Sequence, residues 1–195
     1  GVGWVMPSSG APTASGLGSR ALAALPAVSA TSAASTDTAS VSTLQALAAA
    51  RERALPGSRT TGMHDRRATL YCSAEAHYSL TRAAELLGIG RDNVRPIAID
   101  DRRRMRPEAL ADAIDSDVAV GITPLAVVAT AGTTLTGAVD PIDAIADVCQ
   151  ERDLWLHVDG AYGLPAAAAP TSAPRFAGLD RVDSLSVDAH KWMFV

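Results

Sequence analysis

Short runs of consecutive apolar residues alternate along the chain with segments in which apolar residues recur every three or four positions. A short apolar run is typical of a strand buried on both faces, and the wider spacing is typical of an amphipathic helix. The pattern predicts a first helix that begins near Ser40, followed by helices over residues 79–87, 107–114 and 141–152. It predicts strands over residues 68–72, 94–99, 125–129, 154–158 and 184–187.

This alternation of strands and helices predicts an α/β fold, with a mostly parallel sheet and helices on both faces. Pro107 and Pro141 fit the pattern, because proline is tolerated in the first turn of a helix. Ligands of such sheets bind at the carboxyl ends of the strands, so the residues that follow each strand are the first candidates for a site. The apolar runs are all shorter than the roughly 18 residues of a membrane span, so we expect no membrane association.

The chain divides into two parts of different composition. Residues 1–36 are rich in Ala, Ser, Thr, Pro and Gly, with few large apolar residues and almost no charge. Such a segment buries too little apolar surface to offset the entropy lost on ordering, so we expect it to be poorly ordered. Residues 37–195 carry the regular pattern and are expected to form the folded domain.

The charge balance excludes several classes of partner. The chain has 17 Lys and Arg against 21 Asp and Glu, a formal net charge of −4, and its basic residues are scattered. The densest basic run, at 102–104, is flanked by acidic residues and is expected to be a solvated turn, so we expect no nucleic-acid surface. Cys72 and Cys149 lack metal-ligand spacing and are too few for a disulfide framework. We expect buried free thiols, no metal site and a cytoplasmic location.

One lysine stands out, because the 17 basic residues are sixteen Arg and the single Lys191. Arg replaces Lys in an ordinary solvated ion pair. It cannot replace a nucleophilic amine, because the guanidinium stays protonated whereas a desolvated ammonium can lose its proton. Chance retention of one lysine is the alternative, and a chemical role for Lys191 is the hypothesis that explains the count.

Four predicted strands are followed by segments with polar residues, at 73–77, 130–134, 159–163 and 188–191. Parallel strands end at one edge of a sheet, so these segments are expected to meet there. Each polar residue has an ordinary alternative: His77 could cap a helix, Asp159 could be a turn residue, and His190 could be a core histidine. Four such segments at one edge nevertheless favour a binding site.

The same segments resemble the pyridoxal-phosphate-dependent decarboxylases, in the group that includes aromatic amino acid and glutamate decarboxylases. The resemblance covers residues from about 37 to 195. Its motifs are specific only when they occur together, since His-Lys or Gly-Thr-Thr alone means little. It implies part of the large domain of a type I pyridoxal-phosphate enzyme. Its carriers are Asp-Thr-Ala-Ser at 37–40, Ala-His at 76–77, Ala-Gly-Thr-Thr at 131–134, Leu-Trp-Leu-His-Val-Asp-Gly-Ala-Tyr-Gly at 154–163 and His-Lys-Trp at 190–192.

The resemblance implies a catalytic role for Lys191, Asp159 and His77. Lys191 would hold pyridoxal 5'-phosphate as a Schiff base. Asp159 would face the pyridine nitrogen and keep it protonated, so that the ring accepts the electrons left when carbon dioxide departs. His77 would stack on one face of the ring and Ala161 would pack on the other.

The resemblance also implies a site for the phosphate. Ala39 and Ser40 match the family's phosphate-binding turn at a helix N-terminus, where backbone N–H groups favour an anion. His190 matches a further phosphate contact. Thr133 matches a residue near the ring, with a simple tight turn as the alternative. Asp188 departs from the pattern, because relatives commonly carry a neutral polar residue there.

We therefore expect a carboxy-lyase that decarboxylates an L-amino acid, works as a homodimer when full length and is represented here by a fragment without its C-terminal domain. The substrate is not determined by these residues. Another carbon–carbon lyase of the same fold is the alternative within the family. An inactive doubly wound binding or interaction domain is the alternative from a different class, although it would lack the Gly-x-Gly-x-x-Gly turn and would not explain Lys191.

Overall fold

A computed structural model describes the backbone of residues 3–7, 31–36 and 38–192, and side chains within 38–188 and 190–192. Its strands are β1 (Gly3–Pro7), β2 (Thr31–Thr36), β3 (Ala68–Ser73), β4 (Val94–Ile97), β5 (Thr123–Thr130), β6 (Trp155–Asp159) and β7 (Ser184–Asp188). Its α-helices are α2 (Ala39–Ala54), α3 (Ser58–Thr61), α4 (Ser79–Leu86), α5 (Pro107–Ala119), α6 (Ile142–Glu151) and α7 (Ala189–Trp192). Short 3-10 helices lie at Arg91–Asn93, Leu164–Ala168, Ala173–Phe176 and Leu179–Arg181.

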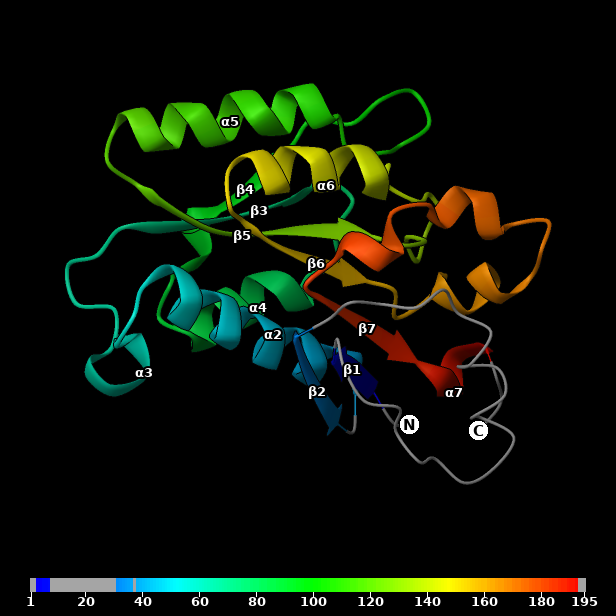
Figure 1. The fold of residues 1–195 in the computed structure, drawn as a ribbon, viewed down its shortest axis with the longest axis horizontal. Coiled ribbons are helices and arrows are strands. Elements are labelled where there is room, and N and C mark those ends of the chain that lie inside the picture. Colours follow the sequence, from blue (N-terminus) through cyan, green and yellow to red (C-terminus); the bar gives the residue numbers. More distant parts are fainter. Residues whose placement is uncertain (1–2, 8–30, 37, 193–195) are drawn as a thin grey trace.

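The strands form one sheet in the order β2-β1-β7-β6-β5-β3-β4 (Figure 1). The five strands from β3 to β7 are parallel, whereas β1 pairs antiparallel with β7 and β2 pairs antiparallel with β1. The predicted α/β fold with a mostly parallel sheet is confirmed.

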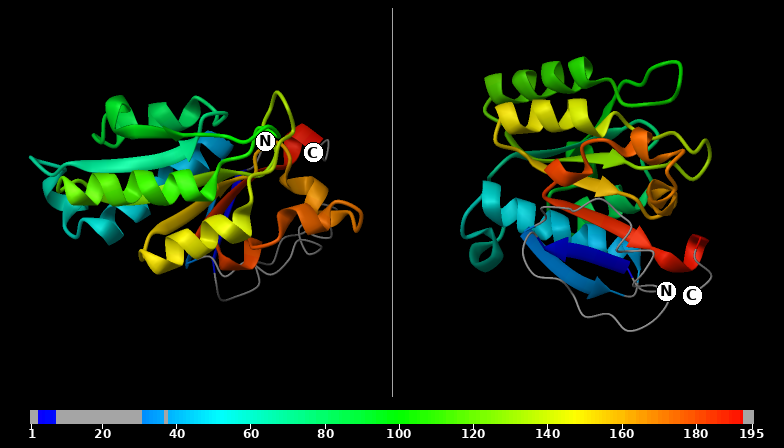
Figure 2. Two further views of the ribbon diagram at one scale, coloured as in Figure 1. Left: turned by 90° about the horizontal axis from the view of Figure 1, so that it is seen from above. Right: turned by 45° about the vertical axis from the view of Figure 1, so that its right-hand side comes forward.

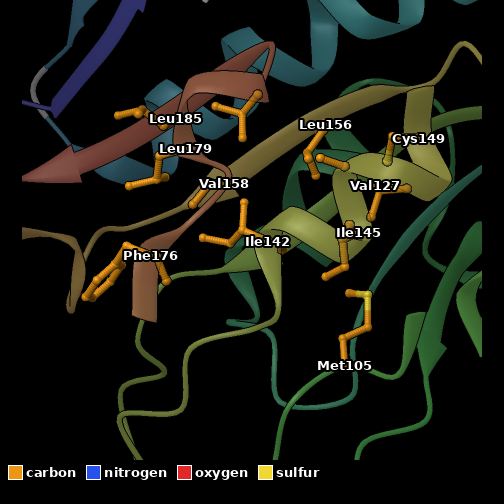
Figure 3. Packing of buried hydrophobic residues seen from close by; sticks show 14 of the residues in the cluster. Met105, Val127, Ile142, Ile145, Cys149, Leu156, Val158, Phe176, Leu179 and Leu185 are labelled. Carbon is orange, nitrogen blue, oxygen red and sulfur yellow. The ribbon is translucent and has the colours of Figure 1, made fainter. Parts of the chain in front are cut away.

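Helices cover both faces of the sheet. Figures 1 and 2 show α5 and α6 on one face and α2 and α4 on the other. Alternate residues of β6 serve the two layers, because successive side chains of a strand point to opposite faces. Leu156 and Val158 pack on the α6 side, in one cluster with Ile142 and Ile145 of α6 (Figure 3). Trp155 packs in the core under α2.

The predicted elements agree with the observed ones to within a few residues, and the larger differences have local causes. Strand β4 ends at Ile97 rather than at residue 99, where Ile99 forms only an isolated bridge with Met105. Pro96 lies within β4, which is tolerated because β4 is an edge strand. Helix α5 continues five residues past its predicted end at 114, as far as Ala119.

A buried polar contact ties this edge of the sheet to α5. Tyr71 in β3 donates a hydrogen bond of 2.9 Å to Asp117, and Arg95 in β4 forms an ion pair of 2.8 Å with the same carboxylate. The Arg95 guanidinium lowers the pKa of Asp117. The carboxylate is thus satisfied on both sides, as burial of a charged group requires.

Residues 1–36 contain two strands that the sequence pattern did not indicate, at Gly3–Pro7 and Thr31–Thr36. The rest of that segment lies outside the described residues. Over the described part of the chain, Cys72 and Cys149 are buried free thiols, and no helix is long and apolar enough to cross a membrane. The basic run at 102–104 lies in a turn, as predicted, and Asp100 holds it by accepting hydrogen bonds from the backbone of Arg102 and Arg104.

Candidate active site

The segments that follow the strands meet at one pocket with a volume of about 190 Å³. Its lining residues come from the carboxyl ends of the parallel strands and the segments that follow them. Helix α7 follows β7 at the same end of the sheet (Figure 1). The pocket is lined by Ala39, Ser40, Glu75, Ala76, His77, Tyr78, Ser79, Thr130, Gly132, Thr133, Thr134, Leu135, Asp159, Ala161, Tyr162 and Lys191. Seven of the eight predicted site residues therefore lie together, and His190 does not line the pocket.

Helix α2 presents its N-terminus to the pocket. Thr38 is extended at the N-cap, and its side chain accepts a hydrogen bond from the backbone of Val41. Ala39 and Ser40 follow in the first turn, which contains no acidic residue. The first N–H groups of a helix have no partner within the helix, and the helix dipole adds positive potential. This end of the pocket therefore suits an anion.

Asp159 ends β6 and lines the pocket. Its Oδ1 accepts hydrogen bonds from the backbone N–H of Ala161, at 3.1 Å, and from Oγ of Ser186 in β7, at 3.3 Å. These two donors come from the next loop and the next strand. They fix the position of the carboxylate before any ligand binds.

The loops after β5 and β6 pack backbone against backbone. Gly132 has a φ of +94°, and a Cβ atom there would lie 2.6 Å from Cα of Gly163. A Cβ atom on Gly163 would lie 2.6 Å from the carbonyl oxygen of Ala131. Only glycine allows this approach, which brings Thr133 to the same pocket as Asp159.

His77 contacts the start of α4. Its Nδ1 accepts a hydrogen bond from the backbone N–H of Ser79, at 3.3 Å, and lies 2.8 Å from the Ser79 hydroxyl. The ring therefore caps the start of α4 while it lines the pocket. It also lies against Tyr78, with ring centroids 4.3 Å apart.

Lys191 lies in α7, directly after β7, and reaches the pocket with a side chain that is 35% exposed. Its Nζ is 3.9 Å from Oδ2 of Asp188, and Nδ1 of His190 contacts the other oxygen of the same carboxylate. The carboxylate of Asp188 is buried and is thus flanked by two basic groups. This arrangement accounts for an acidic residue at a position where a neutral one was expected.

The structure places His190 outside the pocket. Its side chain is 45% exposed, so the alternative of a core histidine is wrong. Its contact with Asp188 instead holds the end of β7 to the start of α7.

Several pocket residues were not singled out from the sequence. Glu75 and Tyr78 flank the predicted His77, and Leu135, which is 90% exposed, stands at the rim next to the predicted Thr133. Tyr162 meets Trp192 edge to face, with ring centroids 5.9 Å apart. Proximity to predicted residues is the only signal in the sequence that could have indicated them.

The model of the pyridoxal-dependent decarboxylase conserved domain matches residues 19–195. The chain belongs to this family. It is 42% identical over 149 residues to 4-hydroxyphenylacetaldehyde synthase from Rhodiola rosea, covering 75% of this chain and 30% of that protein. It is also 42% identical over 153 residues to cysteine sulfinic acid decarboxylase from Rattus norvegicus, covering 78% of this chain and 31% of that protein.

The fold agrees with a solved structure of the same family. The crystal structure of mouse CSAD superposes with a TM-score of 0.83 at 37% identity, covering 90% of this chain and 37% of that one. The chain thus spans about 30% of the length of the curated relatives described above.

Proposed function

We propose that this chain carries the cofactor-binding part of a pyridoxal-phosphate-dependent carboxy-lyase that decarboxylates an L-amino acid. One observation carries the proposal: the only lysine of the chain, a carboxylate held by two donors, and a helix N-terminus without acidic residues line one pocket. Membership of the family supports the same cofactor.

The residues present fit the chemical parts of pyridoxal phosphate. Ala39 and Ser40, at the N-terminus of α2, would bind the phosphate. Asp159 would face the pyridine nitrogen, and Lys191 would bind the carbonyl carbon. His77 and Ala161 would lie against the two faces of the ring. His190 does not line the pocket, so its predicted phosphate contact has less support than the others.

When bound, pyridoxal phosphate supplies an aldehyde that links to amines and a ring that accepts an electron pair from the broken carbon–carbon bond. Lys191 would contribute the amine that attaches the cofactor. Asp159 would favour a proton on the pyridine nitrogen, and the donors Ala161 and Ser186 hold its carboxylate in place. Thr133, whose hydroxyl lies 2.6 Å from that of Thr136, would lie beside the ring.

A second candidate within the family keeps the same pocket and changes the product. The relative from Rhodiola rosea is named as an aldehyde synthase, although it is as similar to this chain as the decarboxylase from Rattus norvegicus. Both candidates need Lys191 and Asp159. They differ in the product: the decarboxylase gives an amine, whereas the aldehyde synthase would also use water and molecular oxygen as a two-electron acceptor and would give an aldehyde, ammonia and hydrogen peroxide.

Two features of the surface and the core bear on assembly and location. Val41, Tyr78 and Leu86 are exposed next to the pocket, which supports a homodimer with the site at the subunit boundary. Cys72 and Cys149 are buried free thiols, which supports a reducing, cytoplasmic location.

The direct test measures carbon dioxide, amine, aldehyde and ammonia from a panel of aromatic and acidic L-amino acids, with the full-length protein loaded with pyridoxal phosphate. We expect the wild type to release carbon dioxide and Lys191→Ala to release none. Arg102→Ala is the matched control, because it removes an exposed cation that does not line the pocket, and it is expected to retain the activity. Amine as the coproduct supports the decarboxylase, and aldehyde with ammonia supports the second candidate. Absence of carbon dioxide from every substrate would contradict both.

A further inference from the structure

A fully buried histidine, His157 in β6, lies behind the pocket without lining it. Its Nε2 is 3.2 Å from Oγ1 of Thr43 in α2, and its Nδ1 is 2.8 Å from Oγ of Ser184 in β7. The indole N–H of Trp155 donates to the same Ser184 oxygen, at 2.8 Å. One imidazole therefore joins α2, β6 and β7.

These three elements carry the groups that the proposed function assigns to the cofactor. Thr43 lies about one helical turn after Ala39 and Ser40, at the phosphate end of the pocket. Asp159 follows His157 by two residues on the same face of β6. On β7, Ser184 lies two positions before Ser186, which donates a hydrogen bond to the Asp159 carboxylate.

The contacts of His157 suit an uncharged ring. Burial lowers the pKa of His157 to about 4, against the opposing effect of the Asp159 charge. The neutral imidazole has one donor and one acceptor, and a hydroxyl on each side complements either tautomer. A buried polar group whose partners are all present fixes their relative positions more narrowly than an apolar side chain of similar size.

We infer that His157 is a positioning residue, which fixes the N-terminus of α2 relative to Asp159 and so sets the distance between the phosphate end and the ring end of the pocket. The inference rests on the proposed function. His157 acts through Thr43 and Ser184, because its own side chain does not reach the pocket.

Thr43→Val gives the sharpest test, because it removes the hydroxyl that meets His157 and keeps the shape of the side chain. The dissociation constants of pyridoxal phosphate and of pyridoxal, which lacks the phosphate, are measured by absorbance with the full-length protein. We expect pyridoxal phosphate to bind about tenfold more weakly in Thr43→Val, the effect of one unsatisfied buried group. Pyridoxal affinity is expected to change less than about twofold, because pyridoxal does not use the α2 end of the pocket.

Three further variants separate positioning from general destabilisation. Thr43→Ser restores the hydroxyl and is expected to bind both ligands like the wild type. Tyr71→Phe removes a buried hydrogen bond of similar kind on the α5 side of the sheet, and is expected to leave both affinities unchanged. Adding His157→Phe to Thr43→Val is expected to lower pyridoxal phosphate affinity by less than His157→Phe does alone, because the Thr43 contact is already broken and only the Ser184 contact remains to be lost.

Equal loss of affinity for both ligands in Thr43→Val, or no loss for either, would overturn the inference. So would a Tyr71→Phe variant with the same selective loss. A wild-type protein that captures neither ligand would contradict the proposed function itself, and the inference with it.

Discussion

The carboxylates of Asp159 and Asp188 lie 29 positions apart in a chain of 195 residues and face the same end of the sheet, yet they have different partners. Asp159 is held by neutral donors, from Ala161 and Ser186, and keeps its charge available to a ligand. Asp188 is flanked by His190 and Lys191, and its charge is used within the protein. The two positions therefore predict different consequences of substitution.

Asp159→Asn is expected to bind pyridoxal phosphate but to lower kcat by about 100-fold, a loss typical of removing one electrostatic contact that strengthens in the transition state. The neutral amide cannot hold a proton on the pyridine nitrogen. Steady-state kinetics and the absorption spectrum of the bound cofactor check this expectation. A variant that turns over at the parent rate would contradict the role of Asp159.

Two buried groups give opposite dependences of stability on pH. Burial raises the pKa of Asp140 to about 6, so the folded state binds a proton more readily than the unfolded state and loses stability as pH rises from about 4 to 6. Burial lowers the pKa of His157 to about 4, so the folded state gains stability as pH rises from about 4 to 6.5. The two contributions have opposite signs over this pH range and oppose each other in the wild type.

Substituting one of these two residues should leave the pH dependence of stability that the other one causes. Between pH 4 and 6.5, the free energy of unfolding is expected to rise with pH in Asp140→Asn and to fall with pH in His157→Gln. Urea unfolding at a series of pH values, followed by circular dichroism, measures both slopes. Parallel slopes in the two variants would show that these residues do not titrate as their burial requires.

At the scale of elements, the site depends on two loops that approach each other through glycines. The loop after β5 turns at Gly132, and the loop after β6 passes it at Gly163. Asp140 fixes the first loop by accepting hydrogen bonds from the backbone of Thr130 and Met105, both at 2.7 Å. Thr133 therefore has a defined position beside Asp159.

Gly132→Ala is expected to weaken cofactor binding and to lower stability by more than Gly137→Ala in the same loop. Both residues have positive φ, so both substitutions carry the backbone strain of about 1 kcal/mol. Only the Cβ at Gly132 would meet another backbone, whereas nothing lies within 4 Å of one at Gly137. Thermal unfolding and titration with pyridoxal phosphate compare the two variants, and equal losses would contradict the close-packing argument.

The sequence pattern was sufficient for the central parallel strands β3, β5, β6 and β7, which are largely buried, and it also indicated the edge strand β4 although that strand contains Arg95 and Pro96. It was insufficient for β1, a five-residue strand that pairs with β7, and for β2, which consists of small residues and pairs with β1. The convergence of Lys191, Asp159 and His77 followed from the strand ends. The contact of His157 with Thr43 joins residues 114 positions apart, and no local pattern indicates which buried polar groups will meet.

At the scale of the whole molecule, the exposed large apolar side chains fall on both layers of helices. Leu86, which is 75% exposed, lies with Val41 and Tyr78 on the surface formed by α2 and α4, next to the pocket. Val118, which is 56% exposed, lies on α5, on the opposite layer. A homodimer with the site at its boundary would cover the first surface and leave the second in water.

Leu86→Glu is therefore expected to weaken self-association of the full-length protein by about tenfold or more, because it places a charge where apolar surface is buried. Val118→Glu is the matched control on the opposite layer and is expected to leave association unchanged. Sedimentation equilibrium measures both. The reverse pattern would place the subunit boundary on α5.

Lys191 is proposed to bind the cofactor in the pocket at the carboxyl ends of the strands. The full-length protein is loaded with pyridoxal phosphate, reduced with borohydride and digested, and the modified peptide is identified by mass spectrometry. The account predicts a pyridoxyl group on Lys191 and its loss in Lys191→Arg, which keeps the charge but not the nucleophilic amine. A pyridoxyl group found on another amine, with Lys191 unmodified, would contradict the account.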